Sequence, residues 1–324
     1  MTADAVAYVD PDRLDTNLRS FHGRAAAAGV RVRAHVKGHR TVEIARRQIA
    51  AGARGIAVHH AREVRRYAGA GIRDIVVSHP WEDPWRWELL ARSAADCRLT
   101  LHVASPEAVA GLGRAAARRS TPVGVLLDLR AGPDGSPPAP SEVLALARAV
   151  VDRPWLRLRG VTGYRGLDTA ADAEARHTIG AAYATSLVET AGLLRSHGLP
   201  CATVCVGGTP TAAGALEVDG ITEVCAGAYA LQDVGLAAIG VCTQEQIALS
   251  VSGPREAAEL VGEYGYAWLA ADDTARRSGN RWLPAHVCPV VQRVRALLPG
   301  RVRPDEPAEW AVLATGDKET DVLT

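Results

Sequence analysis

The sequence predicts an α/β protein in which a closed (β/α)8 barrel of the TIM type is followed by a small C-terminal β domain. Eight short apolar runs alternate with Ala-, Arg- and Leu-rich helical stretches, and the runs are apolar on both faces, as in a parallel sheet covered by helices. Eight such units are the number that closes a barrel. After about Leu231 the alternation stops. We therefore expect a barrel over residues 11–235 and a β domain formed by residues 1–10 and 236–324.

Local signals define the elements in chain order. Residues 5–9 read as a short strand, and Asp10-Pro11 then starts a helix, because Asp is a favoured N-cap and Pro fits the first helical turn. Gly29 ends that helix. Helices of the barrel are expected near residues 42–51, 61–68, 106–117, 140–151 and 171–196. Its strands are expected at residues 32–36, 55–58, 74–78, 99–103, 123–129, 156–161, 203–206 and 221–225.

An open doubly wound sheet is the alternative to the barrel. It ranks lower because the first strand of such a sheet is followed by a Gly-rich nucleotide-binding turn, which is missing after residues 32–36. Trp81, Trp85 and Trp87 are expected to pack in the loop after the third strand. The β domain is expected to contain strands at residues 246–251, 267–270, 282–291 and 310–315, with residues 5–9 able to complete its sheet.

Composition narrows the class of protein. The chain has 324 residues, of which 48% are hydrophobic, so it can bury a large core. Its net charge of +1, without runs of like charge, argues against a nucleic-acid partner. No apolar run is long enough to cross a membrane, and the N-terminus lacks the pattern of a signal peptide. We expect a cytoplasmic protein that acts on a small molecule, with its six cysteines reduced.

Polar residues gather where the expected strands end, whereas the strand interiors read as apolar. The stretch RVRAHVKGHR, residues 31–40, delivers Lys37 from an apolar strand into a loop that begins with Gly38. A desolvated lysine close to other cations can have a lowered pKa, which lets its amine form a Schiff base with an aldehyde cofactor and later move protons. A solvated lysine at a strand end is the alternative.

Glycines follow the last two barrel strands. The seventh strand ends in VCVGGTPT, where Gly207, Gly208 and Thr209 can present N–H and hydroxyl groups to a phosphate. Gly227, after the eighth strand, is placed to do the same, and phosphate sites recur at this position in such barrels. A plain Gly-Gly turn is the alternative. Together with Lys37, the pattern points to a phosphorylated aldehyde such as pyridoxal 5'-phosphate (PLP).

A second group of candidate ligands lies in PAHVCP, residues 284–289. If this stretch is a strand, His286 and Cys288 point to the same face. An imidazole nitrogen and a thiolate are a natural pair for zinc, and two protein ligands leave coordination positions open for water or substrate. A buried cysteine beside a strand-edge histidine is the alternative.

These residues together resemble a known family. RAHVKGHR is similar to the Arg-Pro-His-x-Lys-Thr-His-Lys signature of the D-threonine aldolase and D-serine dehydratase family, which are fold-type III PLP enzymes related in architecture to alanine racemase. The similarity continues, in the same order, through GVTGYRG with Tyr164, through VGGTPT, through TEVCAGAY with Asp233 four residues further on, and through PAHVCP. It covers nearly the whole chain.

The resemblance implies a role for each matching residue. Lys37 would hold PLP covalently, His35 would lie beside the cofactor, and Tyr164 would lie near its pyridine ring. His286 and Cys288 would bind a divalent metal, Zn2+, that contacts the β-hydroxyl of the substrate. The residues expected around the phosphate are Gly207, Gly208, Thr209, Gly227 and Tyr229.

The resemblance also implies an activity. The expected protein is a homodimeric lyase that acts on a D-β-hydroxy amino acid. Because dehydratases of the family carry His-x-Cys where its aldolases carry His-x-Asp, Cys288 favours dehydration to a keto acid and ammonia. Retro-aldol cleavage, an amino-acid racemase or epimerase, and a PLP-binding protein without turnover are the alternatives.

Three departures from the family pattern concern the substrate pocket. Gly38 and Arg40 stand where the signature has Thr and Lys, and Leu167 stands where the family has a frequent active-site histidine. The segment EYGYAWLAAD, residues 263–272, lies about a dozen residues before Pro284, where relatives have a much longer insertion. We expect this shortening to reshape the pocket.

Overall fold

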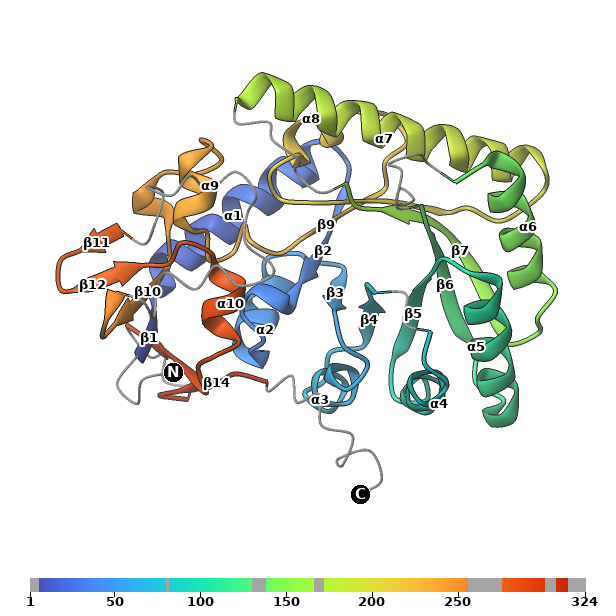
Figure 1. The fold of residues 1–324 in the computed structure, drawn as a ribbon, viewed down its shortest axis with the longest axis horizontal. Coiled ribbons are helices and arrows are strands. Elements are labelled where there is room, and N and C mark those ends of the chain that lie inside the picture. The colour runs from blue at the N-terminus through green and yellow to red at the C-terminus, as the bar shows by residue number, and fades with distance from the viewer. Residues whose placement is uncertain are drawn as a thin grey trace.

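A computed structural model describes residues 6–79, 82–129, 138–165, 172–255, 276–300 and 307–313. It contains a closed parallel barrel and a six-stranded sheet beside it (Figure 1), which confirms the predicted fold class. The barrel closes where its first and last strands pair in parallel, with Arg31 opposite Glu223. The barrel strands are β2 (Arg31–His35), β3 (Gly55–Val58), β4 (Asp74–Val77), β5 (Arg98–Val103), β6 (Val123–Asp128), β7 (Leu156–Gly163), β8 (Thr203–Gly207) and β9 (Glu223–Ala226).

Helices cover the outside of the barrel, and their starts follow from the capping residues. Asp10 accepts hydrogen bonds from the N–H groups of Asp12 and Arg13, with Pro11 in the first turn. Ser105 and Asp172 cap two later helices in the same way. The barrel helices are α1 (Pro11–Ala27), α2 (Val42–Ala50), α3 (Glu63–Gly69), α4 (Pro84–Ser93), α5 (Pro106–Arg119), α6 (Pro140–Val151), α7 (Ala173–Ser196) and α8 (Ala212–Leu216).

Helix α4 corrects one expectation. Trp85 and Trp87 lie in this helix rather than in a loop, and Trp87 is buried. Its start at Pro84 after Asp83 has the same Asp-Pro pattern as the start of α1. Trp81 lies outside the described residues.

The second sheet takes strands from both ends of the chain. Its order is β11-β12-β10-β1-β13-β14, and β1 (Val6–Val9) lies in its middle, antiparallel to β10 (Leu249–Ser252) and parallel to β13 (Ala296–Pro299). Figure 1 shows this sheet beside the barrel, near α1 and α2. The remaining strands are β11 (Arg276–Ser278), β12 (Arg281–Leu283) and β14 (Trp310–Ala311).

The prediction of a strand at residues 282–291 is wrong after the first residues of that range. Strand β12 ends at Leu283, and α10 (Val287–Val291) follows after His286. Pro284 cannot donate to a sheet ladder, and Pro289 falls in the first turn of α10, where no N–H is required. The strand expected at residues 267–270 lies outside the described residues.

The barrel interior contains buried charged side chains, although the sequence predicted that the strand interiors are apolar. Arg33 donates through Nε and Nη2 to the two oxygens of Glu223 at 2.6 and 3.1 Å, and through Nη1 to Asp74 at 2.9 Å. Gly55 leaves room for the guanidinium, because a Cβ there would lie 2.8 Å from Nη1. Asp74, Glu223 and Gly55 all begin their strands, so this ionic layer lies at the end of the barrel opposite the strand-end residues.

Candidate active site

Lys37 lies on the barrel rim, in the one-turn helix η1 (Val36–Gly38) that follows β2. Its N–H donates to Nδ1 of His35 at 3.3 Å, so Nε2 of that ring carries the proton and donates to Ser78 Oγ at 2.8 Å. Ser78 in turn donates to the carbonyl of Val58. Burial, followed by the charge of Lys37, lowers the pKa of His35 well below its ordinary value. His35 is therefore a neutral support for the Lys37 turn.

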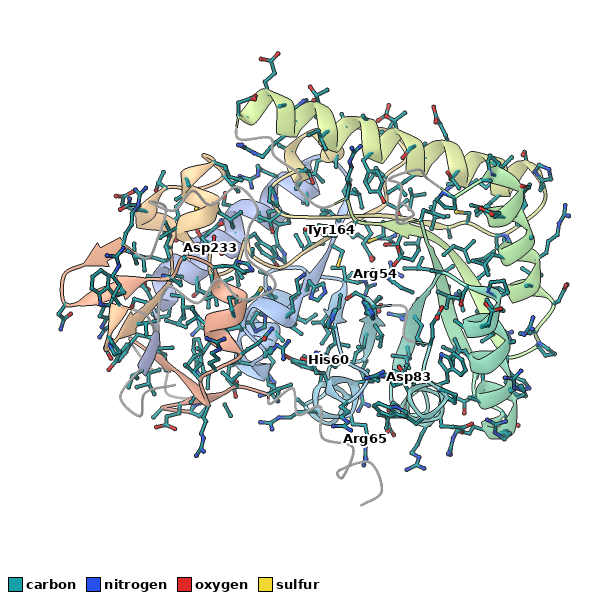
Figure 2. All side chains as sticks on the ribbon, viewed as in Figure 1. Arg54, His60, Arg65, Asp83, Tyr164 and Asp233 are labelled. Carbon is teal, nitrogen blue, oxygen red and sulfur yellow. The ribbon has the colours of Figure 1, made fainter. Side chains whose placement is uncertain are left out.

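Tyr164 brings the end of β7 next to Lys37. The Nζ atom of Lys37 lies 5.9 Å from the centroid of the Tyr164 ring. The ring is half exposed and covers the glycine turn after β8: a Cβ at Gly207 would lie 3.0 Å from Tyr164 Cβ, and one at Gly208 would lie 3.3 Å from Cε2. Gly208 also has a φ of +116°, which favours glycine. Figure 2 shows Tyr164 beside the barrel strands.

The loops after β8 and β9 are joined to each other and to the Lys37 turn. Thr209 Oγ1 accepts the N–H of Tyr229 at 3.2 Å, and the N–H of Gly208 donates to the carbonyl of Cys225 at 3.0 Å. A Cβ at Gly227 would lie 2.6 Å from the carbonyl oxygen of His35. The structure thus brings together Lys37, Tyr164 and the glycines that were predicted to surround a phosphate.

The side chain of Tyr229 points away from this site. Its ring stacks on Phe21 at a centroid distance of 4.2 Å, and its hydroxyl lies 2.8 Å from Nε2 of His22. Only the backbone N–H of Tyr229, through Thr209, reaches the loop where the phosphate is expected.

A buried chain of hydrogen bonds runs behind the rim. The N–H of Thr41 donates to His39 Nδ1, so Nε2 of His39 carries a proton and donates to Gln48 Oε1 at 3.1 Å. Gln48 Nε2 donates to the Tyr229 hydroxyl, which is hydrogen-bonded to Nε2 of His22. This chain ties the Lys37 loop, α2, the loop after β9 and α1 together. No local sequence signal could reveal it, because Gln48 and Tyr229 are 181 residues apart.

His286 and Cys288 come together although they do not lie in a strand. His286 is the residue before α10, and Cys288 is in its first turn. Burial alone would lower the pKa of His286, but Cys288 and the hydrogen bond to Asp233 raise it to about 10. Burial opposes ionisation of Cys288, yet His286 and Lys37 lower the pKa of this thiol. The pair is therefore an electrostatic neighbour of Lys37.

The pair is held in place by packing and by Asp233. Helix α10 packs against η1, and a Cβ at Gly38 would lie 3.8 Å from Val287 Cγ1. Asp233 accepts a hydrogen bond from His286 Nδ1 at 2.9 Å. Within the described ranges, no group of three or more His, Cys, Asp or Glu side chains could hold a metal ion, so His286 and Cys288 are a two-residue donor set.

Other histidines line the rim at the ends of β3 and β4. The His59 ring lies 4.8 Å from that of His60 and 5.0 Å from that of His79. Burial, then His60 and His79, lower the pKa of His59 to about 3. Nδ1 of His102 lies 3.6 Å from Asp128 Oδ2. Leu167, which the sequence singled out, lies outside the described residues.

The fold and the site define a class of protein. A closed eight-stranded parallel barrel with a separate β sheet beside it is the architecture of alanine racemase-like, fold-type III PLP enzymes.

The chain belongs to the alanine racemase N-terminal domain family, whose model matches residues 9–232. The D-threo-3-hydroxyaspartate dehydratase of Delftia sp. (strain HT23) is 33% identical over 98% of this chain and 86% of its own length. A D-threonine aldolase of Arthrobacter sp is 30% identical over 71% of this chain and 63% of its own length. The resemblance inferred from the motifs is thereby confirmed.

Solved structures agree with this assignment. The D-threo-3-hydroxyaspartate dehydratase from Delftia sp. HT23 superimposes with a TM-score of 0.80 at 27% identity, covering 98% of this chain and 99% of that one. The D-threonine aldolase from Filomicrobium marinum superimposes with a TM-score of 0.80 at 22% identity, over 95% of this chain and 94% of that one, which supports the fold. Enzymes of the family are PLP-dependent.

In the described part of the chain, no helix is long and apolar enough to cross a membrane.

Proposed function

We propose that this protein is a PLP- and divalent-metal-dependent lyase that removes water from a D-configured β-hydroxy amino acid, giving a keto acid and ammonia. The observation that carries the proposal is that Lys37, the glycine turn under Tyr164, and the His286–Cys288 pair lie together on one barrel rim. An amine, an anion cradle and a pair of metal donors at one place are the groups that this reaction requires.

The residues fit the cofactor. Gly208 and Gly227 leave space that side chains would fill, since a Cβ at either would lie within 3.0 Å of a neighbouring oxygen atom. Thr209 Oγ1 accepts the N–H of Tyr229, so its own proton points elsewhere and can be donated to a phosphate oxygen. Tyr229 supports the phosphate site through this bond, while Lys37 would hold the aldehyde and the Tyr164 ring would lie near the pyridine.

The donor set fits a zinc ion. Imidazole nitrogen and thiolate sulfur are typical zinc ligands, and two protein ligands leave room for the substrate hydroxyl and water. The metal is further supported by solved structures of D-threo-3-hydroxyaspartate dehydratase, which include a histidine-to-alanine variant and a metal-free cysteine-to-alanine variant two positions further on. His286 and Cys288 have the same separation.

The protein side chains divide the chemistry between them. When bound, PLP supplies an electron sink for the charge left on the substrate α-carbon, and a bound zinc ion supplies a Lewis acid to the β-hydroxyl. The Lys37 amine, in its uncharged form, removes the α-proton. His35 and Ser78 hold the Lys37 turn against the rim, and Tyr164 covers the glycine turn.

Dehydration is preferred to cleavage for two reasons. The dehydratase of Delftia is 33% identical over nearly the whole chain, and Cys288 matches the His-x-Cys pattern that the resemblance associates with dehydration. Retro-aldol cleavage is the second candidate, because a D-threonine aldolase is 30% identical and a 3-hydroxy-D-aspartate aldolase of Paracoccus denitrificans is 28% identical. A homodimer remains part of the proposal, and analytical ultracentrifugation tests it.

Product analysis tests the function. The purified protein with PLP and zinc is given D-serine, D-threonine and both diastereomers of D-3-hydroxyaspartate. Keto acid and ammonia in equal amounts are expected, with activity lost in EDTA and restored by zinc. Glycine plus an aldehyde would establish the retro-aldol reaction instead, and the L-enantiomer would establish a racemase. Lys37→Ala should lose both activity and the visible absorbance of the lysine–cofactor link.

A further inference from the structure

Asp233 is a buried carboxylate between the barrel and α10, and the function proposed above gives it no part. It is fully buried and lies after the loop of β9, as the N-cap of the short helix α9 (Val234–Ala238). Figure 2 shows it beside α9 and α10. In the sequence, this residue is notable only because it lies four residues after the TEVCAGAY motif.

Both oxygens of Asp233 accept hydrogen bonds from backbone N–H groups. Oδ1 accepts the N–H of Leu236 at 2.9 Å, and Oδ2 accepts the N–H of Val287 at 3.1 Å. Both oxygens of the carboxyl group therefore act as acceptors at this position. The third donor is the imidazole of His286, whose Nδ1 lies 2.9 Å from Oδ2.

The direction of this third hydrogen bond determines which nitrogen of the imidazole ring is available to a metal ion. Since the carboxylate accepts, Nδ1 of the His286 ring carries a proton, which leaves Nε2 as the nitrogen whose proton a metal ion can displace. A ring nitrogen must release its proton to bind a metal ion, and Nδ1 is held by Asp233, so Nε2 is the nitrogen that would act together with Cys288.

Asp233 also fixes where the imidazole lies. The two residues after Asp233 donate their N–H groups to the two residues before His286, from Val234 to Pro284 at 3.0 Å and from Gly235 to Ala285 at 3.1 Å. Together with the bonds to His286 and Val287, these contacts attach the start of α10 to the barrel loop. The donor pair is therefore held by the barrel that carries Lys37.

We propose that Asp233 is a positioning residue, which holds His286 in the tautomer and orientation that present Nε2 to a divalent metal shared with Cys288. The proposal rests on the proposed function for the metal itself. It differs from a capping role, because a cap needs only the bond from Leu236 to Oδ1, whereas this role needs the bond from His286 to Oδ2.

Asp233→Asn separates the two roles. If the amide oxygen of Asn faces Leu236, its NH2 group faces His286 Nδ1 and the N–H of Val287. An NH2 group at this place favours the tautomer of His286 without a proton on Nδ1. It also faces the N–H of Val287, so that two hydrogen-bond donors point at each other. A matched control is Asp172→Asn: Asp172 caps α7 by accepting the N–H of Ala175 at 2.7 Å, at the same three-residue spacing, but it is exposed. Cys288→Ala removes a proposed metal ligand and is the reference for loss of the site.

The measurement is the zinc dissociation constant of the full-length, PLP-loaded protein, obtained by competition with a chelating dye. Asp233→Asn should weaken zinc binding by about 10- to 100-fold, as losses of such carboxylates do, while Asp172→Asn leaves it unchanged. Affinity of Asp233→Asn within twofold of the wild type would overturn the proposal. A wild type that binds zinc no better than Cys288→Ala would overturn the metal site itself, and this proposal with it.

A spectroscopic measurement does not depend on the folding of any variant. In the zinc-loaded wild-type protein labelled with 15N-histidine, the ring signals that disappear in His286→Gln identify His286. They should show a protonated Nδ1 and a metal-bound Nε2. Coordination through Nδ1 would overturn the role of Asp233 while leaving the metal site in place.

Discussion

The guanidinium of Arg33 and the carboxylate of Glu223 form a two-point hydrogen bond across the pair of strands that closes the barrel. Nε lies 2.6 Å from Oε1, Nη2 lies 3.1 Å from Oε2, and both side chains are almost fully buried. Asp74 completes the pairing from the other side of Arg33. The closure of the barrel thus depends on charge as well as on apolar packing.

Breaking this pair should strongly destabilise the protein. Glu223→Gln leaves the Arg33 charge buried with one fewer ionised partner, and removing one partner of a buried pair costs about 3–5 kcal/mol. Arg98→Gln is the matched control, because Arg98 also donates to Asp74 but is 60% exposed; its loss should stay below about 1 kcal/mol. Urea unfolding measures both, and equal losses for the two variants would contradict a special role for the buried pair.

The buried histidine His39 should make stability depend on pH. Burial lowers its pKa from 6.5 to about 3, so the unfolded chain takes up a proton between these values that the folded protein excludes. The contribution of His39 to the free energy of unfolding is complete above pH 6.5. It is lost as the pH falls below that value, at about 1.4 kcal/mol per pH unit.

His39→Gln tests this slope. It removes the titrating group while keeping an amide that can donate to Gln48, so the decline in unfolding free energy between pH 6.5 and 4.5 should be flatter than in the wild type. His197→Gln, at an exposed histidine after α7, serves as the control and should keep the wild-type slope. An unchanged slope in His39→Gln would show that His39 is not the group responsible.

Tyr229 should matter for stability more than for cofactor binding. Tyr229→Phe keeps the stacking on Phe21 but leaves His22 and Gln48 without their shared partner, at a cost of about 1–3 kcal/mol. PLP affinity should change little, because only the backbone of Tyr229 reaches Thr209. Thr209→Val should instead weaken PLP binding, which a spectroscopic titration of the cofactor-free protein measures. A large loss of PLP affinity in Tyr229→Phe would mean that its hydroxyl acts in the site.

Gly208 should be required for space as well as for backbone conformation. Gly208→Ala would strain a backbone with φ of +116° and bring Cβ to 3.0 Å from Thr211 Oγ1. Gly52→Ala is the matched control: φ is +104° there, but nothing lies within 4 Å of the added Cβ. Both should lose about 1–3 kcal/mol of stability, and only Gly208→Ala should lose PLP affinity. Equal PLP affinity for the two would contradict a cofactor cradle at Gly208.

The parts that the sequence predicted well are those with local signals. Apolar runs that alternate with helical stretches predicted all eight barrel strands, and the Asp10-Pro11 cap predicted the start of α1. The common location of Lys37 and the glycine turns could be predicted because strand ends in a barrel meet at one rim.

The parts that were missed depend on contacts between distant residues or on weak patterns. Arg33 looks like an interruption of an apolar strand until Glu223, 190 residues away, is placed beside it. Helix α10 was read as a strand because Val287, Val290 and Val291 favour strands, whereas the prolines around them prevent one. Asp233 became informative only when its bond to His286 was known.

The placement of β1 between β10 and β13 has a consequence for how the polypeptide is assembled on the ribosome. Strand β1 finds these neighbours only after residues 249–252 and 296–299 have been synthesised, so it must wait for the whole barrel segment before it can pair. A fragment that begins at residue 11 would lack the strand in the middle of the sheet. The barrel and the sheet cannot be separated by a cut at one position, since the sheet takes strands from segments before and after the barrel.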